Sequence, residues 1–229
     1  SVQLTLFDYL QEYNGVNKYV RRISYEETKP FLLNIHYARR MPCITDAFGL
    51  FIDMELIGIV TYGIPASHWL CIGLAGEENS DNVLELNRLV ILPEYNGKNY
   101  ASYLISHSLR QLPNRTFVVS YADTAWSHIG YISQATNFLY TGMTAKRTDA
   151  YIPNGMHQRH GFEAYKHEMY RQTRSVKHRY VYLVGDKRTK KQMLKELKYP
   201  VITPYPKGDE VKYNTEDPKP IKPIRKITK

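Results

Sequence analysis

The sequence has little of several features that would assign it to a particular class of protein. It contains two cysteines, Cys43 and Cys71, and neither belongs to a C-x-x-C pair. This argues against a disulfide framework and against a four-thiolate metal site. No apolar run is long enough to span a membrane, and the N-terminus lacks the basic-then-apolar pattern of a secretory signal. We therefore expect a soluble protein of a reducing cytoplasm, with no membrane partner.

Excess positive charge is also missing from most of the chain. The net charge is +9, yet residues 1–170 contain 14 basic and 16 acidic residues. Residues 171–198 contain 10 basic and 2 acidic residues, a local charge of +8. Such a segment is either a solvated helix surface or a surface that binds phosphates by releasing counterions. We favour contact with nucleic acid, through Lys177, His178, Arg179, Lys187, Arg188, Lys190 and Lys191.

Apolar periodicity predicts an α/β protein. The chain of 229 residues is 43% hydrophobic, which suffices to bury a core. Ser24 and Glu27 have the capping-box spacing and predict the start of a first helix. The continuous apolar run from Leu89 to Leu92 is typical of a buried central strand. Strands are predicted at 48–53, 56–65, 83–93, 116–123, 138–142 and 177–185, and further helices at 98–112, 129–137 and 186–197.

The chain divides into three parts by composition. Residues 13–199 carry the periodic elements and are predicted to form one domain. Residues 200–229 hold six of the twelve prolines and little apolar periodicity, so they are predicted to be extended along a surface or mobile. Residues 1–12 precede the domain as a separate peptide.

The N-terminal peptide contains the pentapeptide QLTLF. It is either a first core strand or a docking peptide that inserts Leu and Phe into a pocket on a partner. QLTLF resembles the bacterial sliding-clamp-binding pentapeptide. That resemblance implies that the protein binds the clamp, and hence visits DNA, through Gln3, Leu4, Leu6 and Phe7.

Two predicted strands end where an open α/β sheet places its binding crevice. The first turns through residues 96–101 into a helix, whose free backbone N–H groups would face an anion. The second ends in Ser120, Tyr121 and Asp123, which puts a carboxylate at the mouth of the crevice. Each observation has a plainer explanation, because Asn-Gly is an ordinary turn and an Asp after a strand is often the N-cap of the next helix.

The order of these segments carries a family resemblance. One stretch of the chain resembles the GNAT acyltransferase superfamily. It is the run LELNRLVILPEYNGKNYASYLISHSLRQL followed by FVVSYADTAWSHIGYISQATNFLYTGMT. Residues 25–205 resemble the phage Mom family of DNA-modification proteins. The motifs that carry this resemblance are HYARRMP, ELNRLVIL, VVSYAD and IGYISQATNFLYTG, together with the C-terminal basic strand and helix. The resemblance implies a GNAT-like mixed central sheet flanked by helices. It also implies conversion of adenine in phage DNA to an N6-carbamoylmethyl form, in the bacterial host cytoplasm, as protection from restriction.

The resemblance also indicates a cofactor site, with one departure from the superfamily pattern. Asn99 stands where the usual loop has its middle glycine, which restricts backbone approach to a pyrophosphate. The donor is then acetyl-CoA in a modified pose or another activated acyl or aminoacyl compound. Iron is a further candidate from the family, although the sequence shows no complete ligand set, and His157 and His160 are more typical of a surface. The implied cofactor-binding residues are Val90, Ile91, Gly97, Lys98, Asn99, Ala101 and Ser102.

The acceptor chemistry needs a proton acceptor, because the lone pair of adenine N6 is delocalised into the ring. Asp123 can take that proton, and the resemblance places His36, Tyr37 and Ser120 beside it. His36 would serve as acid, base or metal ligand. The plainer interpretation of His36 is an imidazole at the end of a helix, near the C-terminal dipole.

A base in duplex DNA must also be flipped out and gripped before it can react. The candidate residues for substrate binding are Asn87, Arg88, Tyr121, Trp126 and Tyr131, with Arg39 and Arg40 contacting DNA. Strand alternation predicts that one of Asn87 and Arg88 faces the crevice. Two other functions stay open at this point, a non-enzymatic adaptor with a degenerate GNAT fold and an ordinary N-acetyltransferase.

Overall fold

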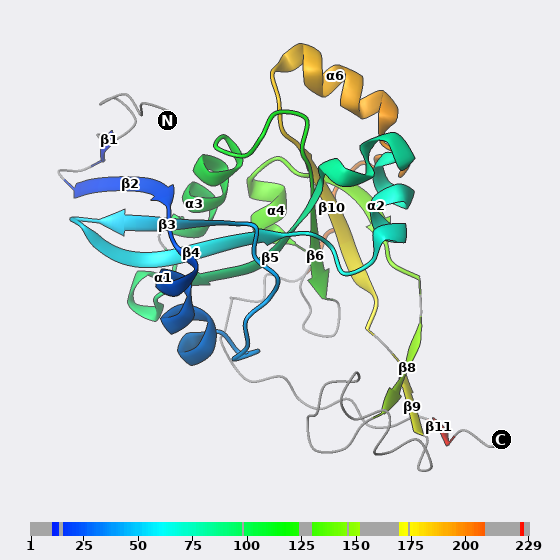
Figure 1. Cartoon of the computed structure of the whole chain (residues 1–229), viewed down its shortest axis with the longest axis horizontal. Helices are drawn as coiled ribbons and strands as arrows, with labels where there is room; N and C mark the ends of the chain where they lie inside the picture. The colour runs from blue at the N-terminus through cyan, green and yellow to red at the C-terminus, as the bar shows by residue number, and fades with distance from the viewer. Residues whose placement is uncertain are drawn as a thin grey trace.

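A mixed sheet of eight strands, in the order β1-β2-β3-β4-β5-β6-β10-β7, forms the centre of the structure (Figure 1). The computed structural model describes residues 11–13, 16–97, 99–123, 130–145, 147–151, 170–173, 175–208 and 225–226. The strands are β1 Gln11–Tyr13, β2 Val16–Arg22, β3 Asp46–Ile52, β4 Glu55–Gly63, β5 Val83–Ile91, β6 Phe117–Asp123, β7 Leu139–Met143 and β10 Lys177–Leu183. A small separate sheet contains β8 Thr148–Tyr151, β9 Tyr170–Thr173 and β11 Arg225–Lys226.

Helices lie on both faces of the main sheet. They are α1 Tyr25–Pro30, η2 Phe31–Ile35, α2 His68–Ala75, η3 Glu77–Asn82, η4 Pro93–Tyr95, α3 Tyr100–Leu109, α4 Tyr131–Ala135 and α6 Lys187–Glu196. The predicted mixed α/β sheet flanked by helices is confirmed. Among the described helices, none is long and apolar enough to cross a membrane.

The two faces of the sheet bury different clusters. We call one the α3 face, where Leu104 of α3 packs with Phe48, Tyr62 and Val118 in the largest core. We call the other the site face. Phe31 and Leu32 of η2 cover one part of it, against Ile59 and Val90. A separate part is covered by α2 and α6, through residues such as Cys71, Leu74 and Met193.

The strands β5 and β6 form a fork. They are parallel neighbours, and their ladder runs from Val83↔Phe117 only as far as Glu85↔Val119. Beyond these pairs the rest of β5 pairs with β4 alone, while β6 continues along β10. A fork of this kind leaves backbone groups of β5 available to a ligand.

The strand β5 also contains a β-bulge. Thr61 of β4 pairs with Arg88, whereas the next residue, Tyr62, pairs with Leu86. Asn87 is therefore the extra residue in the ladder. Since cross-strand partners share a face, the bulge places Arg88 on the site face together with Glu85, which pairs with Gly63.

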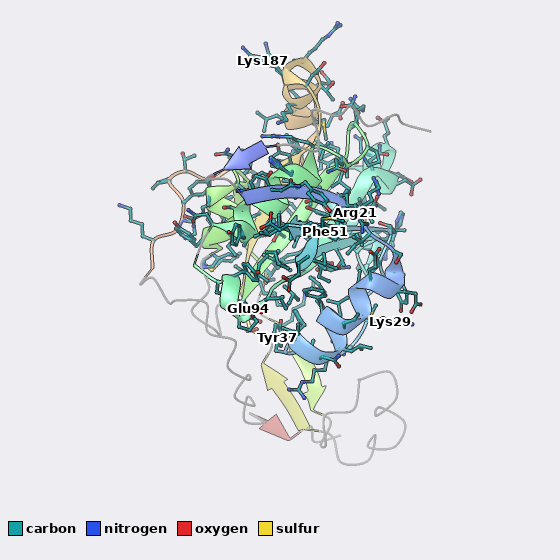
Figure 2. The ribbon with its side chains drawn as sticks, turned by 90° about the vertical axis from the view of Figure 1, so that its left-hand side faces the viewer. Arg21, Lys29, Tyr37, Phe51, Glu94 and Lys187 are labelled. Carbon is teal, nitrogen blue, oxygen red and sulfur yellow. The ribbon has the colours of Figure 1, made fainter. Side chains whose placement is uncertain are left out.

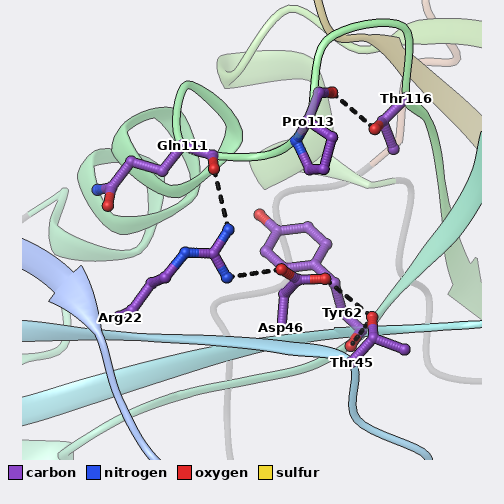
Figure 3. Close-up of polar contacts among 7 residues, drawn as sticks. All are labelled: Arg22, Thr45, Asp46, Tyr62, Gln111, Pro113 and Thr116. Atoms are coloured by element: carbon purple, nitrogen blue, oxygen red, sulfur yellow. Dashed lines mark hydrogen bonds and ion pairs between the residues drawn. The ribbon is translucent and has the colours of Figure 1, made fainter. Parts of the chain in front are cut away.

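Polar contacts fix the chain where it enters β3 (Figure 3). Arg22 Nη1 donates to Asp46 Oδ1 at 2.6 Å, and Arg22 Nη2 donates to the Gln111 carbonyl at 3.1 Å. Thr45 Oγ1 donates to Asp46 Oδ2 at 2.9 Å and to the Tyr62 carbonyl at 3.3 Å. These bonds join β2, β3 and β4 to the turn after α3, so the segment that precedes Thr45 has a fixed end.

Several predicted elements agree with the structure and others were missed. The capping box is present, with Ser24 N donating to Glu27 Oε2 at 2.7 Å, and the hairpin of β3 and β4 turns at Asp53 and Met54, both with positive φ. Neither β2 nor α2 was predicted. The pentapeptide QLTLF lies outside the described residues, as do Lys98, Trp126, His157 and His160.

Candidate functional site

His36 follows η2 and lies at the start of a segment, residues 36–43, that runs along the site face. Its side chain is 9% exposed, its backbone N–H donates to the Phe31 carbonyl, and its Nδ1 accepts from Ala38 N at 3.1 Å. Burial, followed by the nearby Arg88 guanidinium, lowers the pKa of His36 to about 4. The imidazole is therefore neutral at pH 7. Because Nδ1 accepts a hydrogen bond, the proton is on Nε2, so His36 can donate a hydrogen bond but is not a ready base.

Tyr37 gives the site an exposed aromatic surface. Its side chain is 57% exposed, and its ring centroid lies 4.3 Å from that of His36 at an interplanar angle of 30°. Figure 2 shows Tyr37 at one end of the main body. Arg39 and Arg40 follow as exposed cations, and Arg39 has a positive φ of 44°. The segment thus presents an aromatic ring next to two positive charges.

Asn87 clamps this segment onto the sheet. Its Oδ1 accepts from Thr61 Oγ1 at 2.5 Å, and its Nδ2 donates to the Cys43 carbonyl at 2.7 Å. The segment lies so close that a Cβ on Gly63 would come within 2.0 Å of the same Cys43 oxygen. Both polar groups of the Asn87 amide are used, so the structure gives it a role in holding the segment.

Arg88, the next residue, is half-buried beside the same segment. Its Nη1 donates to the Asn87 carbonyl at 2.7 Å, and its Nε has no hydrogen-bond partner among the described residues. Burial lowers the pKa of Arg88, and Arg40 adds to the shift, whereas Tyr37 and Glu85 oppose it. Strand alternation predicted that one of Asn87 and Arg88 faces the crevice; the bulge brings both beside the 36–43 segment.

Glu85 is the functional candidate that the sequence analysis missed. It is the last residue of β5 paired to β6, and it lies opposite Gly63, which has no side chain. Burial raises the pKa of Glu85, although Lys177 and Arg88 oppose the shift. Among the described residues, none forms a hydrogen bond or ion pair with its carboxylate. A half-buried carboxylate without a partner is costly in a purely structural role.

The end of β6 contributes Tyr121 and Asp123 to the site face. Burial raises the pKa of Tyr121, so its hydroxyl stays protonated. Asp123 Oδ2 accepts from Ser175 Oγ at 2.7 Å. In the ladder between β6 and β10, Asp123 lies opposite Lys177. Ser120, by contrast, points to the α3 face, where its Oγ accepts from Ser133 of α4 at 3.5 Å. The structure thus separates Ser120 from Asp123.

The start of α3 retains the geometry of an anion site despite its missing glycine. Asn99 has a φ of 59°, in the left-handed region that asparagine tolerates, and makes no side-chain cap. Gly97 has a φ of 80° and open space where a Cβ would be. Asn99 therefore keeps a glycine-like backbone, and the first N–H groups of α3, from Tyr100 to Ser102, have no side-chain acceptor from the cap.

The other predicted cofactor and substrate residues are dispersed. Val90 is buried under η2 on the site face, whereas Ile91 packs on the α3 face. Ser102 Oγ donates to the Asn99 carbonyl at 3.0 Å, and Ala101 lies in the first turn of α3. Tyr131 is 65% exposed at the start of α4.

Several predicted DNA-binding side chains are engaged within the body. Arg179 donates from Nε and Nη2 to Thr141 at 3.0 Å and lies 3.5 Å from the Tyr199 ring centroid. His178 Nδ1 lies 2.9 Å from the Tyr140 hydroxyl, and Lys190 Nζ donates to the Tyr182 hydroxyl at 3.3 Å. Contact with DNA would compete with these bonds.

The exposed cations of α6 lie far from the site. Lys187, Arg188 and Lys191 are exposed, and Figure 2 shows Lys187 at the end of the main body opposite Tyr37. No group of three or more His, Cys, Asp or Glu side chains within the described part of the chain could hold a metal. These residues therefore give no support to iron.

A sequence model of the Mom protein family matches residues 17–207, which include the 36–43 segment, the fork and α6. No curated protein matches the sequence significantly.

Solved acetyltransferase structures are more distant relatives of the fold. Arabidopsis thaliana NAA60 in complex with acetyl-CoA has 17% identity and a TM-score of 0.46, covering 73% of this chain and 98% of its own. An N-acetyltransferase from Staphylococcus aureus Mu50 has 13% identity and a TM-score of 0.45, covering 73% of this chain and 99% of its own. The ribosomal-protein-S18-alanine N-acetyltransferase from Escherichia coli has 7% identity and a TM-score of 0.42, covering 73% and 94%.

Proposed function

The chain belongs to the Mom protein family, and from this premise we propose that it transfers an acyl-derived group to N6 of adenine in DNA. Family membership and the GNAT-like sheet together support an acyltransferase-type protein of phage DNA modification. One observation carries the finer proposal. An exposed aromatic ring, a neutral histidine and two carboxylates, Glu85 and Asp123, lie on one face of the sheet at its fork.

The acceptor side fits an unstacked base. Tyr37 offers an exposed ring on which a flipped adenine can stack. The Nε2–H of His36 can donate to an acceptor nitrogen on the edge of that base. Arg39 and Arg40 are exposed next to Tyr37 and are suited to the flanking phosphates.

The two carboxylates differ in a way that suggests separate roles. Glu85 lacks a partner among the described residues, and burial raises its pKa, which makes it the better proton acceptor near neutral pH. Asp123 is held by Ser175 and is suited to orienting the amino group. In the proposed step a bond forms between N6 and the electrophilic carbon of the donor, the donor's leaving group departs with the bonding electrons, and the N6 proton moves to Glu85.

The donor would bind at the fork, with its phosphates at the start of α3. The chemistry of the product restricts its identity. An acetyl group contains no nitrogen, so acetyl-CoA alone would yield an acetylated adenine. A glycyl group contains every atom of a carbamoylmethyl group, although in a different order. An activated acyl donor of the CoA class is supported by the acetyl-CoA in the Arabidopsis thaliana NAA60 structure. A glycyl donor would supply every atom of the carbamoylmethyl product, but transfer alone attaches its carbonyl carbon to N6. A later rearrangement must then break that bond and join N6 to the methylene carbon, while the amine nitrogen moves to the carbonyl carbon.

Nucleoside mass spectrometry of plasmid DNA from expressing bacterial cells tests the proposal. We expect adenine heavier by a carbamoylmethyl group in cells with the wild-type protein, and none with Asp123→Ala or His36→Ala. Chromatographic standards must separate the glycyl and carbamoylmethyl isomers, because their masses are equal. Soluble wild-type protein with unmodified adenine, in a host that supplies the donor, would contradict the proposal and favour a DNA-binding adaptor.

A further inference from the structure

The helix α6 carries exposed positive charges that form no ion pair within the described part of the chain. Lys187, Arg188, Lys191 and Lys195 are all exposed. No described carboxylate lies within ion-pair distance of any of them. The one acidic residue of the helix, Glu196, instead accepts from Arg115 Nη2 at 2.9 Å. A solvated helix face usually mixes both charges, whereas this surface has one sign.

The position of these cations is also unfavourable for the helix itself. Asp186 caps the N-terminus by accepting from Thr189 N at 2.7 Å, but the first turn contains no acidic residue and begins with Lys187 and Arg188. Cations at the N-terminus oppose the helix dipole. Residues placed against a local preference of this kind often belong to a binding surface.

This surface is separate from the acceptor site. Lys177 is the first residue of β10 and lies opposite Asp123 in the ladder, at the end of the strand near the site. The helix α6 follows the other end of β10. Seven strand residues span about 20 Å, and Figure 2 places Lys187 and Tyr37 at opposite ends of the body. The α6 cations therefore lie away from the residues that would hold the target adenine and its flanking phosphates.

Composition favours a phosphodiester backbone as the ligand. A helix that lies on a membrane needs a broad apolar face. In α6 the one buried side chain is Met193, which packs into the protein core, and the one exposed large hydrophobic side chain is Leu194. Long flexible cations without an apolar face suit phosphates, whose counterions they release.

We propose that α6 forms a second DNA-binding surface, through Lys187, Arg188, Lys191 and Lys195, which holds a duplex segment other than the one being modified. The inference rests on the proposed function, because it takes the fork as the site that holds the target adenine. Such a surface would keep the protein on long DNA while the site releases one adenine and finds the next.

The number of short duplexes bound per protein tests this directly. We expect the wild type to bind two duplexes of about one helical turn at low salt, and a variant with all four cations changed to Gln to bind one. The double variant Lys187→Gln with Lys191→Gln is a milder form of the fourfold variant. Melting temperatures equal to that of the wild type confirm that both variants are folded. The matched control, Arg39→Gln with Arg40→Gln, removes cations at the site end and should leave the α6 duplex bound.

Long DNA provides the second readout. Loss of four phosphate contacts should reduce the slope of log affinity against log salt by about 3 to 4. Modification of a short duplex should stay within about twofold of the wild type, while modification of plasmid DNA falls about tenfold or more.

Three results would overturn the proposal. In the first, the wild type binds one duplex and both sets of variants weaken that binding. In the second, the fourfold α6 variant still binds two duplexes. In the third, the fourfold α6 variant loses only its binding to anionic phospholipid vesicles. DNA binding with these stoichiometries but no modified adenine would refute the proposed function and leave the second surface standing.

Discussion

The two faces of the sheet are covered in different ways. On the α3 face a continuous apolar cluster runs from β3 to β10 beneath α3 and α4. On the site face, apolar clusters lie under η2 and under α2 and α6, and polar residues of β5 and β6 lie in the sheet between them. One face of the sheet is therefore covered by a continuous apolar core. The other face has a polar strip, formed by the polar residues of β5 and β6, between two apolar clusters.

That difference teaches where stability and chemistry reside. The α3 face buries large side chains such as Tyr62, Phe138 and Tyr180 completely, so its residues are expected to determine the free energy of unfolding. On the polar strip, Arg88 Nε has no hydrogen-bond partner among the described residues, and burial raises the pKa of Glu85. Such residues are expected to affect activity more than stability.

The largest expected effect is on catalysis. Glu85→Gln should reduce the rate of adenine modification by about 100-fold to 10,000-fold, because the proton acceptor is removed. Its melting temperature should be unchanged or higher, since a half-buried charge is neutralised. The wild-type rate should fall as the pH drops through the raised pKa of Glu85, and that limb should be absent from the residual activity of the variant.

Two matched variants sharpen this prediction. Glu78→Gln, at an exposed position, should change neither rate nor stability. Asp123→Asn should lower the rate but keep the acidic limb of the pH profile. If Asp123→Asn removed the limb and Glu85→Gln did not, the two carboxylates would have to exchange roles.

The next effect is on stability, on the opposite face. Leu104→Ala should lower the free energy of unfolding by about 3 kcal/mol, because Leu104 is fully buried and its loss leaves a cavity. Urea denaturation measures this change. The modification rate per folded molecule should stay near that of the wild type, and a large loss of rate at full folding would remove the distinction between the two faces.

A smaller effect concerns pH and His36. The pKa of this histidine is about 4 in the folded protein and 6.5 in the reference state. The unfolded chain thus binds the proton more readily, so the His36 contribution to stability is complete above pH 6.5 and is lost as the pH falls toward 4. By pH 4.5 the loss should be about 2 kcal/mol.

His36→Asn removes the titrating group and should flatten that part of the stability profile. His68→Asn, at an exposed position, is the control and should follow the wild type. Urea denaturation at pH 7, 5.5 and 4.5 provides the comparison. Equal losses in the wild type and in His36→Asn would show that His36 is not held neutral by burial.

The smallest effect on the domain is expected from the N-terminal peptide. We propose that QLTLF recruits the protein to the sliding clamp of its bacterial host, where tethering raises its effective concentration on new DNA. A synthetic peptide of residues 1–10 should bind the clamp. Changing Gln3, Leu6 and Phe7 to Ala should abolish clamp binding and shift the melting temperature by less than about 2 °C. No peptide binding together with a large drop in melting temperature would make QLTLF a core strand.

Much of the fold could be predicted because its signals are local. The capping box at Ser24, the hairpin of β3 and β4 and the apolar run of β5 all encode their structure within a few residues. The helix α2 was missed because HWLCIGLA is apolar almost throughout and shows no periodicity. The edge-side strand β2, VNKYVRR, alternates charged with apolar residues too weakly to be distinguished from a loop.

The site was harder to predict because it depends on relations between distant elements. His36 and Asp123 were found from sequence, but the neutral state of His36 results from burial and from Arg88, more than fifty positions away. Glu85 was overlooked as one polar residue of an alternating strand, although a lone carboxylate among apolar neighbours was a usable signal. The local charge of α6 was visible in the sequence, whereas its distance from Tyr37 depends on the length of β10.

The bulge at Asn87 has a consequence for how this chain can gain or lose residues. In a regular strand, inserting or deleting one residue turns every later side chain to the other face. Asn87 is already the extra residue of its ladder, so its deletion would restore a regular strand and keep Arg88, Leu89 and Ile91 on their present faces. A single-codon insertion into an ordinary sheet would thus suffice to add the clamp on Cys43. The contact between β5 and the 36–43 segment can therefore be added or removed at this one position, without turning the core residues of β5 to the other face.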